Sequence, residues 1–143
     1  MSYKSVPARA FGSIGFDSCS HYQFVHYTNI DRNYEEVLPD VEREWARLET
    51  EFPFPYFPHV SVGWDNNPRF LEFRPGILKN CTPENIEKAL RMAKAYADRH
   101  PEQPPLITIN SWNEWTESSY LEPDDLYGYW YLDAIKKVFV DQK

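Results

Sequence analysis

The chain has 143 residues, a net charge of −7 and an aromatic content of 17%, which suits one domain with a hydrophobic core and with many rings near a surface or cleft. Its basic residues are scattered, so no nucleic-acid partner is expected, and its apolar runs fall far short of the ~20 residues that span a bilayer. The N-terminal residues lack the apolar segment of a secretory signal, and the compartment stays open between cytoplasm and periplasm if the source is bacterial.

The first half of the chain predicts two short strands with an amphipathic helix between them. A weak strand is expected near 13–16. A helix is expected over Tyr34–Glu51, because apolar residues recur there at helical spacing, and Pro39 can delay or kink its start. The second strand covers 56–62 and ends before Gly63.

The second half predicts a helix, a strand and a final helix. Thr82 and the proline that follows it form a strong helix start, because threonine caps free N–H groups and proline suits the first helical position. This helix should reach about Arg99. A short uncharged strand is expected over 106–110, and a last helix should begin near 124–126 and end at about Val140.

Polar clusters follow all three predicted strands. Alternating strands and helices predict an α/β fold with parallel pairing. In such folds ligands bind beyond the carboxyl ends of the strands, in open sheets and barrels alike. The candidate substrate-binding residues are Asp17, Tyr22 and His26 after the first strand, Trp64, Asp65 and Arg69 after the second, and Asn110, Trp112, Asn113, Trp115, Tyr120 and Glu122 after the third.

The third cluster has the composition of a sugar site. Carboxylates supply the acid and base of glycosidic chemistry, tryptophan rings stack on sugars, and amides read hydroxyl groups. Glu114 and Glu117 are the predicted catalytic pair, because positions three apart on a helical turn are neighbours and can divide the roles of proton donor and acceptor. The alternative is that these acids complement a helix dipole, which leaves the tryptophans and asparagines unexplained.

The histidines and cysteines do not indicate a metal centre. His21 and His26 have no third ligand nearby in the sequence, so packing roles are favoured and no metal or cofactor is expected. Cys19 and Cys81 stand far apart and outside any metal-binding spacing. Both are interpreted as small, buried or half-buried thiols.

Three residues near the second and first strands allow two interpretations each. Arg69 can bind sugar hydroxyls, or it can pair with Asp65 or Glu122 and pin its loop, and the ion pair is slightly favoured. Trp64 is favoured as a ligand contact. Asp17 suits a substrate-binding acid and a turn or helix cap equally well.

Three motifs together point to a known family. These are the sequence Asn-Glu-Trp-Thr-Glu at 113–117, Tyr-Leu-Glu-Pro-Asp at 120–124, and Gly-Trp-Asp-Asn-Asn-Pro-Arg at 63–69. In this combination the chain, from about Gly15 to Phe139, resembles the C-terminal half of the WbsX-like proteins of polysaccharide gene clusters. Those proteins carry a domain similar to glycoside hydrolase family 99.

The resemblance implies a mechanism. Family 99 enzymes are (β/α)8 barrels that cleave internal α-mannosidic bonds with retention and without metal, so an oligosaccharide or polysaccharide partner is implied. Glu114 then resembles the base that deprotonates the sugar's own 2-hydroxyl, which becomes the nucleophile, and Glu117 resembles the acid that protonates the leaving oxygen and later activates water. This chain departs from the family motif, with Thr116 for histidine and Ser118 for glycine.

Two other functions stay open beside hydrolysis. WbsX-like proteins are often described as glycosyltransferases, which makes a transferase or polysaccharide-biosynthesis protein the first alternative. A nucleotide-sugar donor would need basic or glycine-rich phosphate-binding groups, and the sequence shows neither. The second alternative is a non-catalytic carbohydrate-binding fragment.

The length predicts part of a barrel rather than a whole one. A (β/α)8 barrel takes about 250 residues, so residues 1–143 are expected to form a single partial barrel domain of about three to four β/α units. Such a piece would expose sheet edges and an apolar face. Either a homo-oligomer that covers them or an open three-layer α/β arrangement is therefore expected, with little activity from this chain alone.

Overall fold

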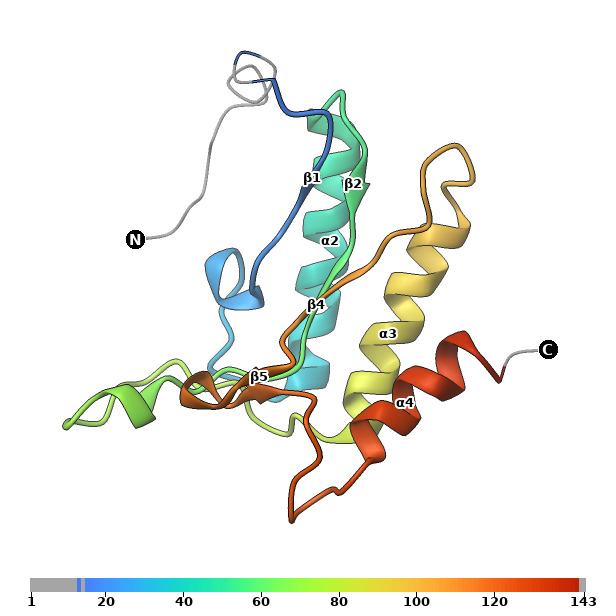
Figure 1. Cartoon of the computed structure of the whole chain (residues 1–143). Coiled ribbons are helices and arrows are strands. Elements are labelled where there is room, and N and C mark those ends of the chain that lie inside the picture. The colour runs from blue at the N-terminus through green and yellow to red at the C-terminus, as the bar shows by residue number, and fades with distance from the viewer. Residues whose placement is uncertain (1–12, 14, 142–143) are drawn as a thin grey trace.

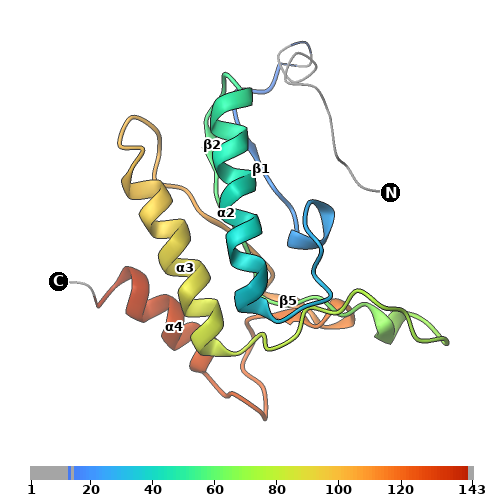
Figure 2. The ribbon, with the colours of Figure 1, turned by 180° about the vertical axis from the view of Figure 1, so that it is seen from behind.

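Figure 1 shows a computed structural model of the chain, which describes residue 13 and residues 15–141. Its α-helices in that part of the chain are α2 (Tyr34–Glu51), α3 (Pro83–Asp98) and α4 (Trp130–Phe139). Helix α2 lies behind strands β1 and β2 in Figure 1 and in front of them in Figure 2. No described α-helix covers the other side of these two strands.

The strands β1 to β4 pair in parallel, as the alternation of strands and helices predicted. β1 (Cys19–Ser20) pairs with β2 (Tyr56–Phe57), and β3 (His59–Ser61) pairs with β4 (Thr108–Asn110). Pro58 separates β2 from β3 because it has no N–H to donate, but its carbonyl still accepts from the N–H of Thr108 across 3.0 Å. The predicted strand at 56–62 is therefore confirmed, but Pro58 divides it into β2 and β3.

The predicted strand near 13–16 is wrong. Gly15 lies in a turn with a φ of 78°, a left-handed conformation that ends an extended segment, and Ile14 lies outside the described residues. The first strand begins only at Cys19. The polar cluster that was expected to follow the first strand therefore lies on both sides of β1.

The first two helices are confirmed, with their caps. Asn33 and Glu36 form a capping box at the start of α2, and the helix continues through Pro39 to Glu51. Thr82 caps α3, where its hydroxyl accepts from the N–H of Asn85. The Thr82 cap fixes where the loop between β3 and α3 ends.

The last helix begins later than predicted. Asp124 Oδ1 accepts from the N–H of Leu126 across 3.0 Å, and its carbonyl accepts from the N–H of Gly128 across 2.9 Å. Gly128 takes a positive φ of 55°, which a helix does not allow. Residues 124–129 therefore form a turn, and α4 starts at Trp130.

Short elements line the carboxyl ends of the parallel strands. They are the 3-10 helices η1 (Phe24–His26), η2 (Asn67–Arg69) and η3 (Trp115–Glu117), and the strands β5 (Asn113–Glu114) and β6 (Ser119–Tyr120), which pair antiparallel. None of these was predicted as a separate element.

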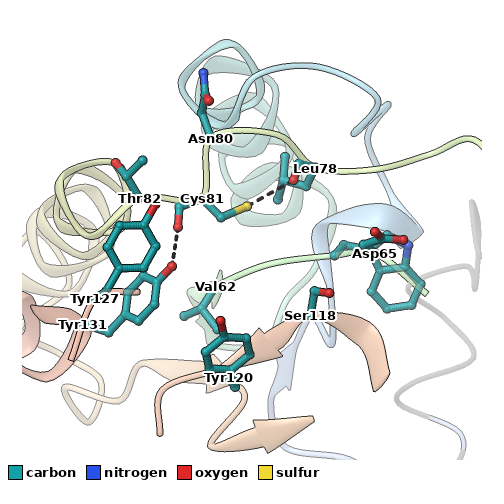
Figure 3. A pocket seen from close by; sticks show the side chains of 11 residues that line it. Val62, Asp65, Leu78, Asn80, Cys81, Thr82, Ser118, Tyr120, Tyr127 and Tyr131 are labelled. Carbon is teal, nitrogen blue, oxygen red and sulfur yellow. Dashed lines mark hydrogen bonds between the residues drawn. The ribbon is translucent and has the colours of Figure 1, made fainter. Parts of the chain in front are cut away.

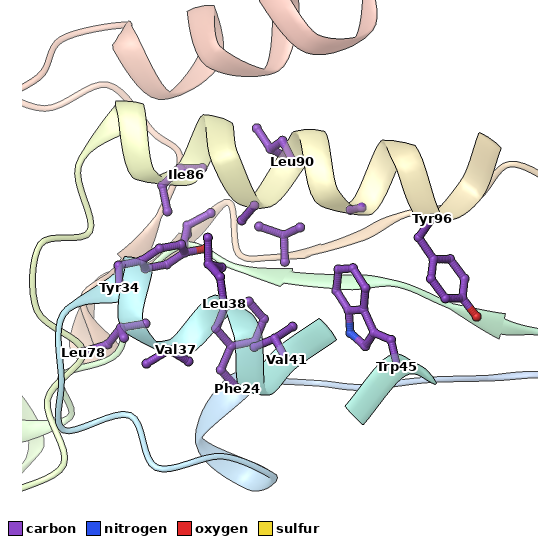
Figure 4. Close-up of a cluster of buried hydrophobic side chains, with 14 of the residues drawn as sticks. Phe24, Tyr34, Val37, Leu38, Val41, Trp45, Leu78, Ile86, Leu90 and Tyr96 are labelled. Carbon is purple, nitrogen blue, oxygen red and sulfur yellow. The ribbon is translucent and has the colours of Figure 1, made fainter. Parts of the chain in front are cut away.

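The core fills the space between α2, α3 and the strands (Figure 4). Trp45 from α2 and Leu90 from α3 are almost fully buried, and Tyr34 is completely buried. The Tyr34 hydroxyl donates to the carbonyl of Ser61 across 2.6 Å, which satisfies its polar end. Helices α2 and α3 therefore pack against β3, close to the residues where the polar loops begin. Within the described residues, no helix is both long and apolar enough to span a bilayer.

Replacing Leu90 by alanine tests this core. Because Leu90 is fully buried, the Leu90→Ala variant should lose about 2–5 kcal/mol of unfolding free energy in urea denaturation. Leu71→Ala is the matched control, since Leu71 is fully exposed and its truncation should change stability by less than about 0.5 kcal/mol. Equal losses in both variants would contradict the assigned core.

His59 should make the fold sensitive to acid. It is buried beside the hydroxyl of Thr108 at 2.9 Å, and burial lowers its pKa to about 3. The unfolded chain protonates this imidazole near pH 6.5, so protonation favours unfolding between these values. The contribution is fully present above about pH 6.5 and is lost as the pH falls, by about 1.4 kcal/mol per pH unit.

Urea denaturation between pH 7 and pH 4 measures this effect. The His59→Gln variant should lose stability less steeply than the parent chain, because it has no imidazole to protonate. Parallel pH profiles for the two proteins would show that His59 does not carry the effect.

Candidate functional site

A short hairpin holds the loop that carries the predicted acids. β5 and β6 pair antiparallel on either side of η3. Ser111 ties its base, because its hydroxyl donates to the carbonyl of Ser119 across 2.6 Å and accepts from the N–H of Glu114 across 3.2 Å. The peptide bond between Asn110 and Ser111, where β4 ends, is cis.

The two predicted acids do not lie on an α-helix. Glu114 ends strand β5, and Glu117 ends the 3-10 helix η3. Ser118 then takes a left-handed φ of 50°, which stops the turn. The prediction that the two side chains are neighbours on a helical turn is therefore wrong. Another residue brings them together.

That residue is Arg69, at the end of η2. Its Nη2 donates to Glu114 Oε1 across 2.9 Å, and its Nη1 donates to Glu117 Oε1 across 2.7 Å. Its Nε donates to the hydroxyl of Thr116 across 2.8 Å, and this hydroxyl donates to Glu114 Oε1 across 2.8 Å. One planar guanidinium thus bridges both carboxylates and offsets their repulsion.

The partners predicted for Arg69 have other roles. Asp65 Oδ1 accepts from the backbone N–H of Asn67 across 2.9 Å, which orders the turn into η2. Glu122 accepts from the indole N–H of Trp115 across 2.8 Å. The expectation that Arg69 pins its loop to an acid holds, but the pairing with Asp65 or Glu122 is wrong, because sequence separation carries no information about which loops meet.

Glu114 and Glu117 differ in their exposure. The Glu114 side chain is 39% exposed, whereas that of Glu117 is 8% exposed. Glu117 Oε2 is buried and has no hydrogen-bond partner within the described residues. A buried carboxylate oxygen without a partner is costly, and it is the kind of atom that a ligand hydroxyl can satisfy.

His26 belongs to the same neighbourhood. Burial lowers the pKa of its imidazole, and the negative charge of Glu117 opposes this change. The His26 ring lies 6.3 Å from that of Trp64 and 5.8 Å from that of Tyr22, between ring centroids. The structure therefore brings three predicted residues from the first and second polar clusters towards the acid pair.

Buried hydrogen bonds around the Gln23 amide stabilise the loop that carries Glu114 and Glu117, called the acid loop below. Gln23 is fully buried, and its Nε2 donates to Asn110 Oδ1 and, across 3.3 Å, to the hydroxyl of Ser119. The Ser119 hydroxyl donates in turn to the backbone carbonyl of Asn110 across 2.9 Å. Asn110 was predicted as a sugar contact but is 8% exposed, so its side chain supports the loop.

Sequence reasoning missed Gln23, Thr116 and Ser119. Gln23 had one usable signal, because it stands among the polar and aromatic residues that follow the first strand. The two hydroxyl residues had none, since serine and threonine are common in loops of every kind.

Close packing at Gly63 joins the second and third loops. A Cβ at this glycine would lie 1.9 Å from the carbonyl oxygen of Ser118. The backbone N–H of Asp65 donates to the carbonyl of Glu117 across 2.8 Å. The loop after β3 and the acid loop therefore touch through their main chains, and only glycine fits at position 63.

The aromatic residues of the acid loop divide into packed and exposed rings. Trp115 stacks on Tyr120, with ring centroids 3.8 Å apart and planes inclined by 23°. Trp112 is 52% exposed, and Asn113 is exposed next to it. Of these predicted contacts, Trp112 has the ring face most open to a ligand.

One predicted residue is not brought to the acid pair. Asp17 is exposed in a bend before β1, and no contact within the described residues links it to Glu114 or Glu117. Tyr22 reaches the site only through its contact with His26, and it is 57% exposed.

Comparisons with known proteins give one consistent result. A family model described as Glycosyltransferase WbsX matches residues 13–135. The uncharacterized protein WxcX of two strains of Xanthomonas campestris pv. campestris is 33% identical over 112 residues. The matched region is 73% of this chain but only 14% of that relative, so the chain spans a small part of the relative's length. No solved structure matches the chain.

A double-mutant cycle tests the bridge between Arg69 and Glu117. Removing the guanidinium leaves a mostly buried carboxylate without its cation, so Arg69→Gln and Glu117→Gln should couple by about 1–3 kcal/mol in urea denaturation. Arg74→Gln is the matched control, because Arg74 lies on the same loop and its guanidinium stacks on the ring of Phe70.

The control cycle of Arg74 with Glu117 should show coupling near zero. Additive effects of the Arg69 and Glu117 substitutions would contradict the bridge. Equal coupling in both cycles would mean that the loop, and not the guanidinium, carries the effect.

Proposed function

The chain belongs to the family described as Glycosyltransferase WbsX, and from this premise we propose that it supplies the acid-bearing wall of a carbohydrate-active site. The proposed activity is hydrolysis of α-linked mannose-type or related polysaccharide. Glu114 takes the proton of the sugar's 2-hydroxyl while that oxygen bonds to the anomeric carbon, and Glu117 protonates the leaving oxygen. Glu117 then takes a proton from the water that attacks the anomeric carbon, and the 2-oxygen regains its proton from Glu114. No metal or cofactor takes part in the proposed reaction.

One observation carries this proposal. Two carboxylates from one loop converge on a single guanidinium beyond the carboxyl ends of parallel strands. In α/β proteins this is where substrates bind, and paired carboxylates are the usual machinery of glycosidic-bond chemistry. The exposed ring of Trp112 beside them supports a sugar as the ligand.

The different environments of the two acids suit different roles. Glu117 is nearly buried, and its second carboxylate oxygen has no partner, so a sugar oxygen could complete its contacts. Glu114 is more open and reaches solvent, as suits a base that removes a hydroxyl proton. Arg69 donates to Glu117 Oε1, so a bound sugar would compete with the guanidinium for this carboxylate.

A glycosyltransferase is the second candidate, and Arg69 is the observation that favours it. Its side chain is 41% exposed, and a guanidinium matches the geometry of a phosphate. A nucleotide-sugar donor would bring a diphosphate leaving group that such a cation can stabilise. In this reaction one glutamate would act as the base on the acceptor hydroxyl.

We extend the proposal to the fold. The parallel strands, the helices behind them and the loops at their carboxyl ends support a partial (β/α)8 barrel. The side of β1 and β2 that no described helix covers would face the barrel interior. Either further β/α units or a second copy of the chain would then cover this side.

Sugar release by the intact gene product tests the proposed function. Incubation with α-mannans and bacterial polysaccharides should release oligosaccharides. Glu117→Gln and Glu114→Gln should each lower the rate by about a hundredfold or more, since a placed acid or base contributes this much. Glu102→Gln is the control, because Glu102 is exposed in the turn after α3 and should leave the rate unchanged.

The outcomes separate the candidates. Transfer from a nucleotide sugar to an acceptor, without hydrolysis, would support the transferase. Oligosaccharide binding that survives both glutamine substitutions, with no turnover of any substrate, would replace both enzymes by a carbohydrate-binding role.

A further inference from the structure

A cavity of about 310 Å³ lies beside the acid loop, outside the group formed by Arg69 and the two glutamates. Figure 3 shows its walls, which come from the loop between β3 and α3 and from the segment that runs from η3 into α4. Ligand pockets begin at about this size, and a small ring fits it better than a long chain. Its lining includes the rings of Tyr120, Tyr127 and Tyr131 and the side chains of Val62 and Leu78.

Several polar groups of the lining already make hydrogen bonds within the protein. The Tyr131 hydroxyl donates to the carbonyl of Cys81, and the Cys81 thiol donates to the carbonyl of Leu78 across 3.3 Å. The Tyr120 hydroxyl donates to Asp124 across 2.8 Å. These bonds fix the walls of the cavity and hold the ring faces in place.

Other polar groups of the lining have no hydrogen-bond partner among the described residues. The hydroxyls of Ser118 and Tyr127 and the Oδ2 atom of Asp65 make no hydrogen bond with any other group in the described part of the chain. Asn80 uses its amide nitrogen on Asn33, which leaves its amide oxygen as an acceptor. Hydroxyl, carboxylate and amide oxygens beside aromatic faces are the contacts that a polyhydroxylated ring needs.

The charge of the lining excludes anions. Asp65 is its one charged side chain, and the described lining includes no lysine, arginine or histidine. A phosphate or a uronic acid would meet a carboxylate with no cation to balance it, at a cost of desolvation and repulsion. A neutral ring meets no such penalty.

We propose that this cavity is a subsite for one neutral hexose unit of the saccharide on which the acid pair acts. The apolar side chains and tyrosine rings contact the C–H face of the sugar, and the free oxygens of Ser118, Tyr127 and Asp65 bind its hydroxyls. This inference rests on the proposed function. It adds that the unit bound here is uncharged, and that a nucleotide diphosphate binds elsewhere.

The subsite is connected to the acid pair through two of its own residues. Ser118 follows Glu117 directly, and the backbone N–H of Asp65 donates to the carbonyl of Glu117 across 2.8 Å. A sugar that contacts both residues therefore lies next to the acid loop. In this position it would hold a unit near the reacting bond and orient the chain.

Titration of the 143-residue chain with D-mannose, followed by protein-detected NMR, tests the subsite. Resonances of Ser118, Asn80 and Tyr127 should shift, with a dissociation constant of about 1 mM, as expected for one weakly held sugar. D-glucuronic acid at pH 7 should cause no shift at the same concentrations. Equal binding of the charged sugar would overturn the assignment.

Substitutions at Tyr127 localise the binding. Tyr127→Ala should weaken mannose binding about tenfold, and Tyr127→Phe, which keeps the ring and the packing, should weaken it by a smaller factor through the lost hydroxyl. Tyr129→Ala is the matched control, because Tyr129 is 67% exposed and outside the lining. Unchanged binding in both Tyr127 variants would overturn the subsite.

The Glu117→Gln variant separates the subsite from the proposed function. Mannose binding that survives this substitution but fails in Tyr127→Ala supports the subsite. Binding that fails in Glu117→Gln and survives in Tyr127→Ala would place the sugar on the acid pair, which overturns the subsite and leaves the proposed function standing.

Discussion

The bridge from Arg69 to Glu114 and Glu117 is the contact on which the candidate site depends. It joins two loops whose contacting residues lie 45 and 48 positions apart in the sequence. Without a cation between them, two carboxylates on one short loop would repel each other and turn outwards. The guanidinium holds both side chains inward, and the main-chain contact between Gly63 and Ser118 keeps the two loops in register.

The sequence predicted best those features that short-range chemistry decides. Helix α2 has the predicted ends, and α3 begins at the predicted cap of Thr82, because caps and apolar periodicity are local signals. The start of α4 was wrong because the side chain of Asp124 and the backbone of Gly128 form a turn that competes with a helix. The partner of Arg69 could not be predicted, since nothing local states which loops meet. The buried role of Gln23 was hidden for the same reason: its partners Asn110 and Ser119 lie 87 and 96 residues away.

Charge divides the candidate site into two regions with different chemistry. In the first region, Arg69 bridges the carboxylates of Glu114 and Glu117, beside a buried carboxylate oxygen of Glu117. The neighbouring cavity has a single carboxylate among neutral oxygens and rings. Under the proposed function, proton transfer takes place in the first region and a neutral ring binds in the second. This division is compatible with membership of the WbsX family. Under a hydrolase or a transferase mechanism, the same cavity would bind the neutral sugar.

If Glu114 and Glu117 hold the reacting saccharide, a bound sugar should contact both side chains and compete with Arg69 for Glu117. The most direct measurement is a crystal structure of the Glu117→Gln variant with a bound mannose oligosaccharide. We expect a sugar ring within hydrogen-bond distance of Glu114 and of the substituted position 117, with the Arg69 guanidinium moved away from position 117. An oligosaccharide bound elsewhere, with the contact between Arg69 and Glu114 unchanged and position 117 untouched, would contradict it.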